Sequence, residues 1–265
     1  MAARARVVVL AALLVSGCAT VSPPFPPEPA PGTLFRSLHV PRGPGPFPAV
    51  ILLHTCGGIE PHLFQWADRL NERGYAAVVL NSFAPRGADK CVVPRYFPAS
   101  GDEVAGDAFA ALLHLRARAG IDGARIGVMG FSWGANAALR VASRSYHRNV
   151  NRFGAVVSLY PMCVSPPDWS GAGRERASNL HGDVDTPTLI LIGENDRDTP
   201  RVVENCVAAV AALRRAGRPV EIKLHPGADH AFDKPSRYHA EATRDAAATA
   251  LRFLDQHLRA GTRSP

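Results

Sequence analysis

Ser132 is the residue of this sequence best suited to covalent chemistry, because it is the centre of the Gly-Phe-Ser-Trp-Gly segment of residues 130–134. An apolar run of strand length, Ile126 to Met129, precedes this G-x-S-x-G pattern, and a helix-forming run from Ala135 follows it. A serine between a strand and a helix occupies a sharp turn, and glycines two residues away allow close approach of the two elements. The pattern predicts an exposed serine nucleophile, and the alternative is a glycine-rich turn with an idle serine.

A serine hydroxyl needs a base that is itself oriented by an acid. Two later segments resemble the acid and histidine loops of α/β-hydrolases: Gly-Glu-Asn-Asp-Arg-Asp-Thr-Pro at 193–200, and Pro-Gly-Ala-Asp-His-Ala-Phe at 226–232. The resemblance implies that Asp196 is the acid and His230 the base, in the chain order that this fold requires. Asp198 is the alternative acid, although it could instead cap the following helix. Weaker histidine candidates end a strand or lie in the last helix: His225, His239 and His257.

Acyl transfer also needs two preorganised donors for the developing oxyanion. One expected donor is the backbone N–H of Trp133, directly after the nucleophile. The other should come from His-Thr-Cys-Gly-Gly at 54–58, which follows a strand-like run. By resemblance to α/β-hydrolases the donor lies two residues past the histidine, which gives the N–H of Cys56. The alternative for 54–58 is a glycine turn with no catalytic part.

The elements that must position these residues alternate regularly along the chain. Apolar runs of strand length are short and continuous, as in strands that are covered on both faces of a parallel sheet. The predicted strands are Ala49–Leu53, Ala76–Leu80, Ile126–Met129, Ala155–Leu159, Thr188–Ile192 and Val220–Leu224. The predicted helices are Leu63–Arg73, Glu103–Ala119, Ala135–Ser143, Pro200–Ala216 and Tyr238–Leu258, with Thr199 as a cap and Gly217 as a stop. This alternation predicts an α/β doubly wound, mostly parallel sheet with its site at the carboxyl ends of the strands.

The N-terminus has the features of an export signal. Arg4 and Arg6 precede an apolar run, Val7–Val15, that is about half as long as a membrane-spanning helix needs. The run ends before Cys18 in a Val-Ser-Gly-Cys segment that resembles a bacterial lipobox, and Ala19 by resemblance favours the periplasmic side of the outer membrane. We expect lipidation of Cys18 and a membrane anchor through that lipid. The expected divisions are a signal peptide over 1–17, a proline-rich tether over 18–32 and a single domain over 33–265.

Four cysteines remain once Cys18 is set aside, and an even number in an oxidising compartment predicts two disulfides. Three pairings are possible. We expect Cys56 with Cys91 and Cys163 with Cys206, because each pair would join loops at the same end of a parallel sheet. The alternative is that some are free buried thiols. No C-x-x-C or H-E-x-x-H spacing occurs in the sequence, so no metal site is expected.

The charge pattern argues against a nucleic-acid partner. The formal net charge is +7, part of which belongs to the leader. The basic residues are scattered and are not arranged with aromatic residues in a stripe. This charge supports only a weak preference for anionic surfaces or substrates.

Taken together, the motifs resemble the dienelactone hydrolase family over nearly the whole mature domain. They are the segments 54–58, 81–87 (Asn-Ser-Phe-Ala-Pro-Arg-Gly), 130–134, 160–163 (Tyr-Pro-Met-Cys), 193–200 and 228–232. The resemblance implies a single-domain α/β-hydrolase without a large lid that cleaves small esters or lactones without a cofactor. Ser132 stands where the name-giving enzymes have cysteine, and Thr55 where they have glutamate. These departures favour a serine esterase mechanism over dienelactone turnover.

Substrate contacts are less sharply defined. Arg86 follows a strand at the predicted edge of the site and could pair with a substrate carboxylate, or it could brace the loop leading to Cys91. Phe232 and Trp133 could line an apolar pocket or simply pack.

The rival functions are a peptidase or polysaccharide esterase on the same fold, and a ligand-binding lipoprotein without catalysis. A complete serine, aspartate and histidine set argues against the last of these.

Overall fold

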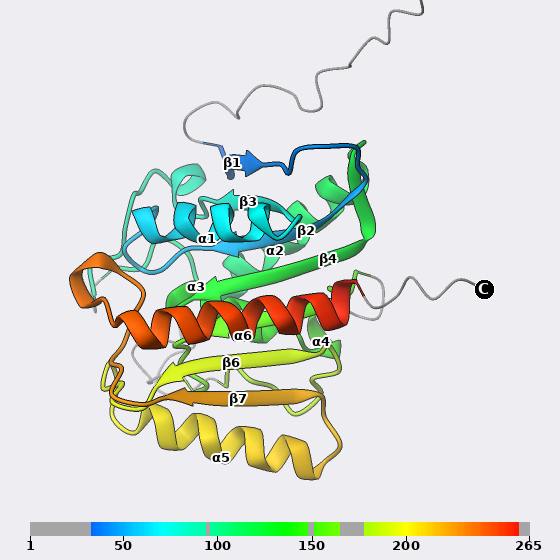
Figure 1. Ribbon diagram of the computed structural model, residues 1–265. Helices are drawn as coiled ribbons and strands as arrows, with labels where there is room; N and C mark the ends of the chain where they lie inside the picture. Colours follow the sequence, from blue (N-terminus) through cyan, green and yellow to red (C-terminus); the bar gives the residue numbers. More distant parts are fainter. Residues whose placement is uncertain (1–32, 94–95, 148–150, 165–177, 260–265) are drawn as a thin grey trace, which may run out of the picture.

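A twisted sheet runs through the molecule with helices on both sides (Figure 1). The computed structural model describes residues 33–93, 96–147, 151–164 and 178–259. The sheet has 7 strands in the order β1-β3-β2-β4-β5-β6-β7, of which β1 is antiparallel to β3 and the others pair in parallel. The strands are β1 (Phe35–His39), β2 (Phe47–Leu53), β3 (Ala76–Leu80), β4 (Ile121–Phe131), β5 (Ala155–Leu159), β6 (Thr188–Gly193) and β7 (Val220–His225).

The continuous apolarity of the central strands is explained by two separate cores. In β2, Ala49, Ile51 and Leu53 belong to one core and Val50 and Leu52 to the other. Side chains alternate between the faces of a strand, so a strand that is covered on both faces must be apolar at every position. The predicted parallel sheet is therefore confirmed.

Helices cover the sheet in two layers. α1 (Pro61–Glu72) and α6 (Ala240–Leu258) lie over one face, in front of the sheet in Figure 1. The other core contains α2 (Gly101–Arg116), α3 (Trp133–Val141) and α5 (Val202–Arg215), and a short α4 (Arg144–His147) follows α3. This three-layer arrangement is the α/β-hydrolase fold that was expected from the sequence.

Two of the differences between the sequence prediction and the structure have a clear physical reason. The edge strand β1 was not predicted, because its half-exposed sequence lacks a continuous apolar run. The predicted start of α5 at Thr199 and Pro200 was wrong. These residues form a turn in which the Val202 N–H donates to the Thr199 carbonyl, and Arg201 before the helix has a left-handed φ of 59°. Gly217 does follow the end of α5, with φ +72°.

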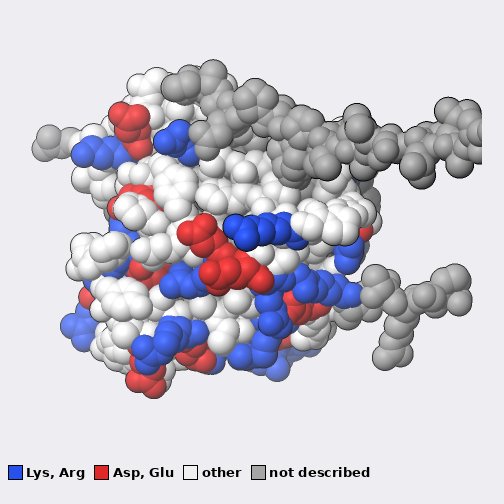
Figure 2. Space-filling model, turned by 45° about the horizontal axis from the view of Figure 1, so that its top comes forward, with Lys and Arg blue, Asp and Glu red and all other residues white. Residues whose placement is uncertain are grey.

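Charges of both signs are mixed on the surface. On the face seen in Figure 2, Lys and Arg side chains lie beside Asp and Glu side chains. The expected signal peptide, Cys18 and the tether fall in 1–32, outside the described residues. Among the helices that the structure describes, none has the length and apolarity needed to cross a membrane.

Candidate active site

Ser132 occupies the turn between β4 and α3, at the carboxyl edge of the sheet. Its φ is 50°, a left-handed conformation that costs a non-glycine residue energy. A Cβ at Gly130 would collide with the carbonyl of Gly134, and a Cβ at Gly134 would collide with the carbonyl of Leu53. Both glycines are therefore required by the close approach of strand, helix and neighbouring loop. The turn is fixed to the sheet by a hydrogen bond from the Ser132 N–H to the Leu159 carbonyl, at 3.0 Å.

Three side chains from distant parts of the sequence form a hydrogen-bonded chain. The Ser132 Oγ lies 3.0 Å from Nε2 of His230, which is in the loop after β7. The Nδ1 of the same ring lies 2.8 Å from Oδ2 of Asp196, which follows β6. When the Nδ1–H group donates a hydrogen bond to the carboxylate, Nε2 is left as an acceptor for the serine hydroxyl. The arrangement can therefore take a proton from Ser132 and stabilise the resulting imidazolium.

Asp196 and Asp198 differ clearly in their relation to this chain. The Asp196 side chain is 0% exposed, and its Oδ1 accepts the Asp198 N–H at 3.0 Å. The Asp198 carboxylate is 31% exposed and lies 3.8 Å from Nε2 of His230, the nitrogen that faces Ser132. Asp198 does not cap α5 either. Only Asp196 is placed to orient the histidine through Nδ1.

An open cleft of about 160 Å³ adjoins Ser132 and His230. Its walls include the loop expected to supply an oxyanion donor, and the lining residues are Thr55, Cys56, Gly57, Ser132, His230, Ala231, Lys234, Ser236 and Arg237. In the described part of the chain, the backbone N–H groups of Cys56 and Trp133 donate to no other group. For Trp133 this follows from its position as the first residue of α3, where no intrahelical acceptor exists. The amide of Cys56, a residue of the cleft wall, and the amide of Trp133, next to Ser132, therefore remain the two candidate oxyanion donors.

His54 fixes the loop that carries Cys56. Its Nδ1 lies 2.7 Å from the Thr55 carbonyl, and its Nε2 accepts the Ser82 N–H at 3.1 Å. Burial lowers the pKa of His54, which keeps the ring neutral with Nδ1 as the donor. In the sequence His54 marks only the position of the predicted oxyanion donor, whereas in the structure it joins the loops after β2 and β3.

The structure contains both expected disulfides. Cys56 is bonded to Cys91, and the Cys91 N–H also donates to the Cys56 carbonyl at 2.8 Å. Cys163 is bonded to Cys206, and both of these residues are buried. The first bridge lies at the candidate oxyanion loop, and the second ties the loop after β5 to α5.

Arg86, Phe232 and the Trp133 side chain do not line the cleft. The Arg86 guanidinium binds the Asp107 carboxylate at 2.8 Å, so its charge is paired within the protein. Phe232 is fully buried against Tyr160, because the turn after His230 directs it into the core. The Trp133 indole stacks on Phe97, with ring centroids 4.7 Å apart.

Two groups of side chains near the site were not found from the sequence. Behind His230, the ring of Tyr160 makes an edge contact at 5.1 Å, and its hydroxyl donates to buried Asp233 at 2.8 Å. In the cleft wall, Lys234 pairs with Glu60 at 2.6 Å, and Glu60 accepts the Thr55 hydroxyl at 2.7 Å. No spacing rule links these positions, because the residues lie far apart in sequence.

The described ranges contain no group of three or more His, Cys, Asp or Glu side chains arranged to hold a metal ion. The hydrogen-bonded chain offers proton transfer at Ser132, and Cys56, one of the two candidate oxyanion donors, lies in the cleft wall. This combination suits the formation and breakdown of an acyl-enzyme.

Comparison with known proteins finds relatives along most of the chain. The model of the dienelactone hydrolase family matches residues 36–258. A protein of Yersinia pestis named as a carboxymethylenebutenolidase is 26% identical over 80% of this chain and 79% of its own length. A solved structure from Klebsiella pneumoniae, described as a dienelactone hydrolase, has a TM-score of 0.64 at 26% identity and covers 83% of this chain and 91% of that one. Esterase 2 of Thermogutta terrifontis shares the fold, with a TM-score of 0.66 at 20% identity over 86% of this chain and 90% of its own.

Proposed function

The chain belongs to the dienelactone hydrolase family, and from this premise we propose that it hydrolyses small carboxylic esters or lactones with Ser132 as the nucleophile. The observation that carries the proposal is the hydrogen-bonded chain from Ser132 through His230 to Asp196. Family membership and the likeness to proteins named as hydrolases support the ester or lactone as the substrate class.

In the proposed mechanism, His230 accepts the hydroxyl proton of Ser132 as Oγ attacks the ester carbonyl. The N–H groups of Cys56 and Trp133 bind the oxygen that becomes negative. His230 then gives its proton to the departing alcohol oxygen, which leaves an acyl group on Ser132. A water molecule that loses a proton to His230 attacks this acyl group, and His230 returns that proton to the Ser132 oxygen as the acid is released. Asp196 keeps the imidazole oriented and stabilises its charged form in both halves of the reaction.

A fluorophosphonate probe tests the nucleophile directly. We expect the probe to label the wild-type protein and to leave Ser132→Ala unlabelled, because the probe bonds only to an activated serine oxygen. Ser236→Ala is the matched control, since Ser236 lines the same cleft and should leave labelling unchanged. Absence of labelling in a folded wild-type protein, or equal labelling of Ser132→Ala, would contradict the proposal.

Substrate preference is tested separately. Short nitrophenyl esters, acetylated xylan and peptide anilides should be assayed side by side with the wild type and Ser132→Ala. We expect the short esters to be cleaved fastest, because the cleft of about 160 Å³ holds only a small group. Dominant cleavage of the anilides would favour a peptidase instead.

We further propose that the protein is exported and anchored by a lipid on Cys18, on the periplasmic side of the outer membrane. The support is the order of charge, apolar run and small residues before Cys18 in the sequence. Cys18→Ser should abolish incorporation of labelled palmitate and shift the protein from the membrane fraction to the soluble fraction. Unchanged labelling would refute the lipid site.

A further inference from the structure

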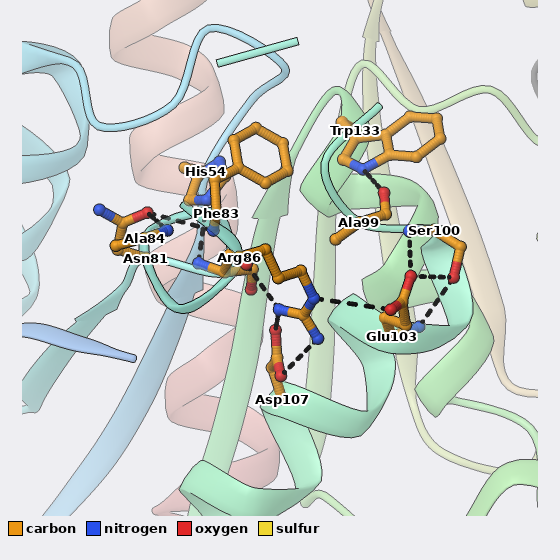
Figure 3. Close-up of polar contacts among 11 residues, drawn as sticks. His54, Asn81, Phe83, Ala84, Arg86, Ala99, Ser100, Glu103, Asp107 and Trp133 are labelled. Carbon is orange, nitrogen blue, oxygen red and sulfur yellow. Dashed lines mark hydrogen bonds and ion pairs between the residues drawn. The ribbon is translucent and has the colours of Figure 1, made fainter. Parts of the chain in front are cut away.

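Arg86 is at the centre of a polar network beside the cleft (Figure 3). Its Nη1 donates to the Ser82 carbonyl at 2.6 Å and to Asp107 at 2.8 Å, and its Nη2 donates to the other Asp107 oxygen at 3.3 Å. Its Nε lies 3.6 Å from the Glu103 carboxylate. The planar guanidinium thus joins the loop after β3 to two acidic side chains on the first turns of α2.

One arm of this network leads to the Cys56 amide. Arg86 holds the Ser82 carbonyl, and the Ser82 N–H donates to Nε2 of His54. The opposite nitrogen of His54 is bonded to the Thr55 carbonyl, the acceptor in the peptide bond that contains the Cys56 nitrogen. Displacement of the loop at Ser82 would therefore be passed directly to the peptide plane that carries the Cys56 N–H.

The other arm leads to Trp133. Glu103 and Ser100 form a reciprocal cap at the start of α2, with the Ser100 N–H donating to Glu103 at 2.8 Å. The preceding carbonyl, that of Ala99, accepts the indole N–H of Trp133 at 3.2 Å. Figure 3 shows the two arms meeting at the Arg86 side chain. The network closes on its far side, where the Gly134 N–H donates to the His54 carbonyl at 3.0 Å.

From this closed ring of contacts we propose that Arg86 is a positioning residue that sets the relative placement of the Cys56 and Trp133 amides. The inference rests on the proposed function, because it assigns Arg86 a role in the same oxyanion site. An oxyanion donor is effective only within a narrow range of distance, so a small shift of either loop lowers the rate of the chemical step. Arg86 acts through its neighbours and does not line the cleft.

The experiment compares a neutral nitrophenyl ester with the same ester extended by a terminal carboxylate, using wild type, Arg86→Met and Arg86→Lys. We expect kcat for Arg86→Met to fall by about 10- to 100-fold on both esters, with KM changed by less than about threefold. The affinity for a trifluoromethyl ketone, whose adduct carries an oxyanion, should weaken by a similar factor. Arg86→Lys keeps the positive charge but loses the planar guanidinium with its several N–H donors, so it should recover only part of the rate.

Arg125→Met is the matched control, because Arg125 is also a half-buried arginine paired with an aspartate, Asp122, at 2.8 Å. It should leave kcat unchanged. If Arg86→Met does not fold, Asp107→Asn weakens the same network from the other side and should lower kcat on both esters.

Wild-type kcat in folded Arg86 and Asp107 variants would overturn the inference. So would a loss confined to the carboxylate ester through a higher KM, which would make Arg86 a substrate contact. A wild-type protein that cleaves neither ester would instead overturn the proposed function.

Discussion

In the half of the site proposed to move protons, the side chains of Ser132 and Asp196 each hydrogen-bond directly to His230. In the half proposed to bind the oxyanion, the working groups are the backbone amides of Cys56 and Trp133. Their positions depend on side chains that lie further away. The first half therefore depends on the identity of a few residues. The second depends on how well a frame of surrounding side chains holds the two loops, and this frame consists of His54, Arg86, Glu103 and Asp107.

This difference predicts two patterns of response to substitution. Replacing a member of the proton-transfer half removes a chemical group, and the loss should be large and confined to very few positions. Replacing a member of the frame around the oxyanion half leaves every amide in place and shifts it slightly. Those losses should be graded, spread over several residues, and expressed in kcat.

The largest effect is expected from Asp196→Asn. The amide oxygen would keep the hydrogen bond from the Asp198 N–H and turn the NH2 group toward Nδ1, so the histidine loses its productive tautomer, and kcat should fall by about 10³- to 10⁴-fold. Asp198→Asn is the matched control, because its carboxylate faces Nε2 from 3.8 Å and is partly exposed. Its kcat should stay within about threefold of wild type. Steady-state kinetics on a nitrophenyl ester, with circular dichroism to verify folding, measures both variants. The reverse ranking would move the acid role to Asp198.

An intermediate effect is expected from removing the Cys56–Cys91 bridge. The double variant Cys56→Ser with Cys91→Ser keeps the amide at position 56 but frees the loop that carries it. We expect kcat to fall by about 10-fold, because the donor is less well placed. The bridge also closes a loop, so its loss should lower the free energy of unfolding by about 2 to 4 kcal/mol.

The second disulfide provides the control for this experiment. Cys163 and Cys206 are separated by 43 residues and Cys56 and Cys91 by 35, so the entropy of loop closure is similar for the two bridges. Cys163→Ser with Cys206→Ser should therefore lose similar stability in urea unfolding, yet keep kcat within about twofold. Equal losses of kcat in the two double variants would mean that the first bridge acts through stability alone.

The contrast between the halves also explains what could be predicted from the sequence. Ser132 and His230 stand in short local patterns that a strand and a turn must satisfy, so the expected neighbours are the ones the structure brings together. The central strands were predictable for the same reason, because burial on both faces requires continuous apolarity. Arg86 was ambiguous, since its partners Asp107 and Glu103 lie on a different element and no local spacing reveals them. The edge strand β1 lacked a signal because it pairs with only one neighbouring strand and is only partly buried.

The link between Tyr160 and Asp233 was hidden in the same way. Both residues belong to recognisable segments, but their contact depends on two loops that meet only after the sheet has formed. Side-chain groups that support a site from behind are thus set by tertiary packing, whereas the reacting groups are set by local turns. The supporting side chains of both halves, Tyr160 behind His230 and Arg86 beside the oxyanion loops, were therefore less predictable than the reacting groups.

The smallest effect is expected at Glu60 and Lys234, whose ion pair joins the oxyanion loop directly to the histidine loop. Burial opposes ionisation of Glu60, but hydrogen bonds from Lys234 and Thr55 outweigh it and hold the pKa of Glu60 below its ordinary value. A carboxyl whose pKa is lowered in the folded state stabilises the protein above its unfolded pKa of about 4.3, and that stability is lost as the pH falls through the lower folded value. At pH 7, Glu60→Gln should therefore reduce the free energy of unfolding by about 1 to 2 kcal/mol, and the difference from wild type should shrink as the pH falls below the unfolded pKa.

Urea unfolding of wild type and Glu60→Gln across this pH range measures the effect, and Lys234→Met with the double variant gives the coupling between the two side chains. We expect kcat to change by no more than about threefold, since the pair touches neither the nucleophile nor an amide donor. A constant stability difference at every pH would show that Glu60 contributes through packing and not through its charge. A loss of kcat as large as that of the Cys56 and Cys91 double variant would mean that the two halves are positioned mainly by each other, and that the frame around the oxyanion half extends across the cleft to the histidine loop.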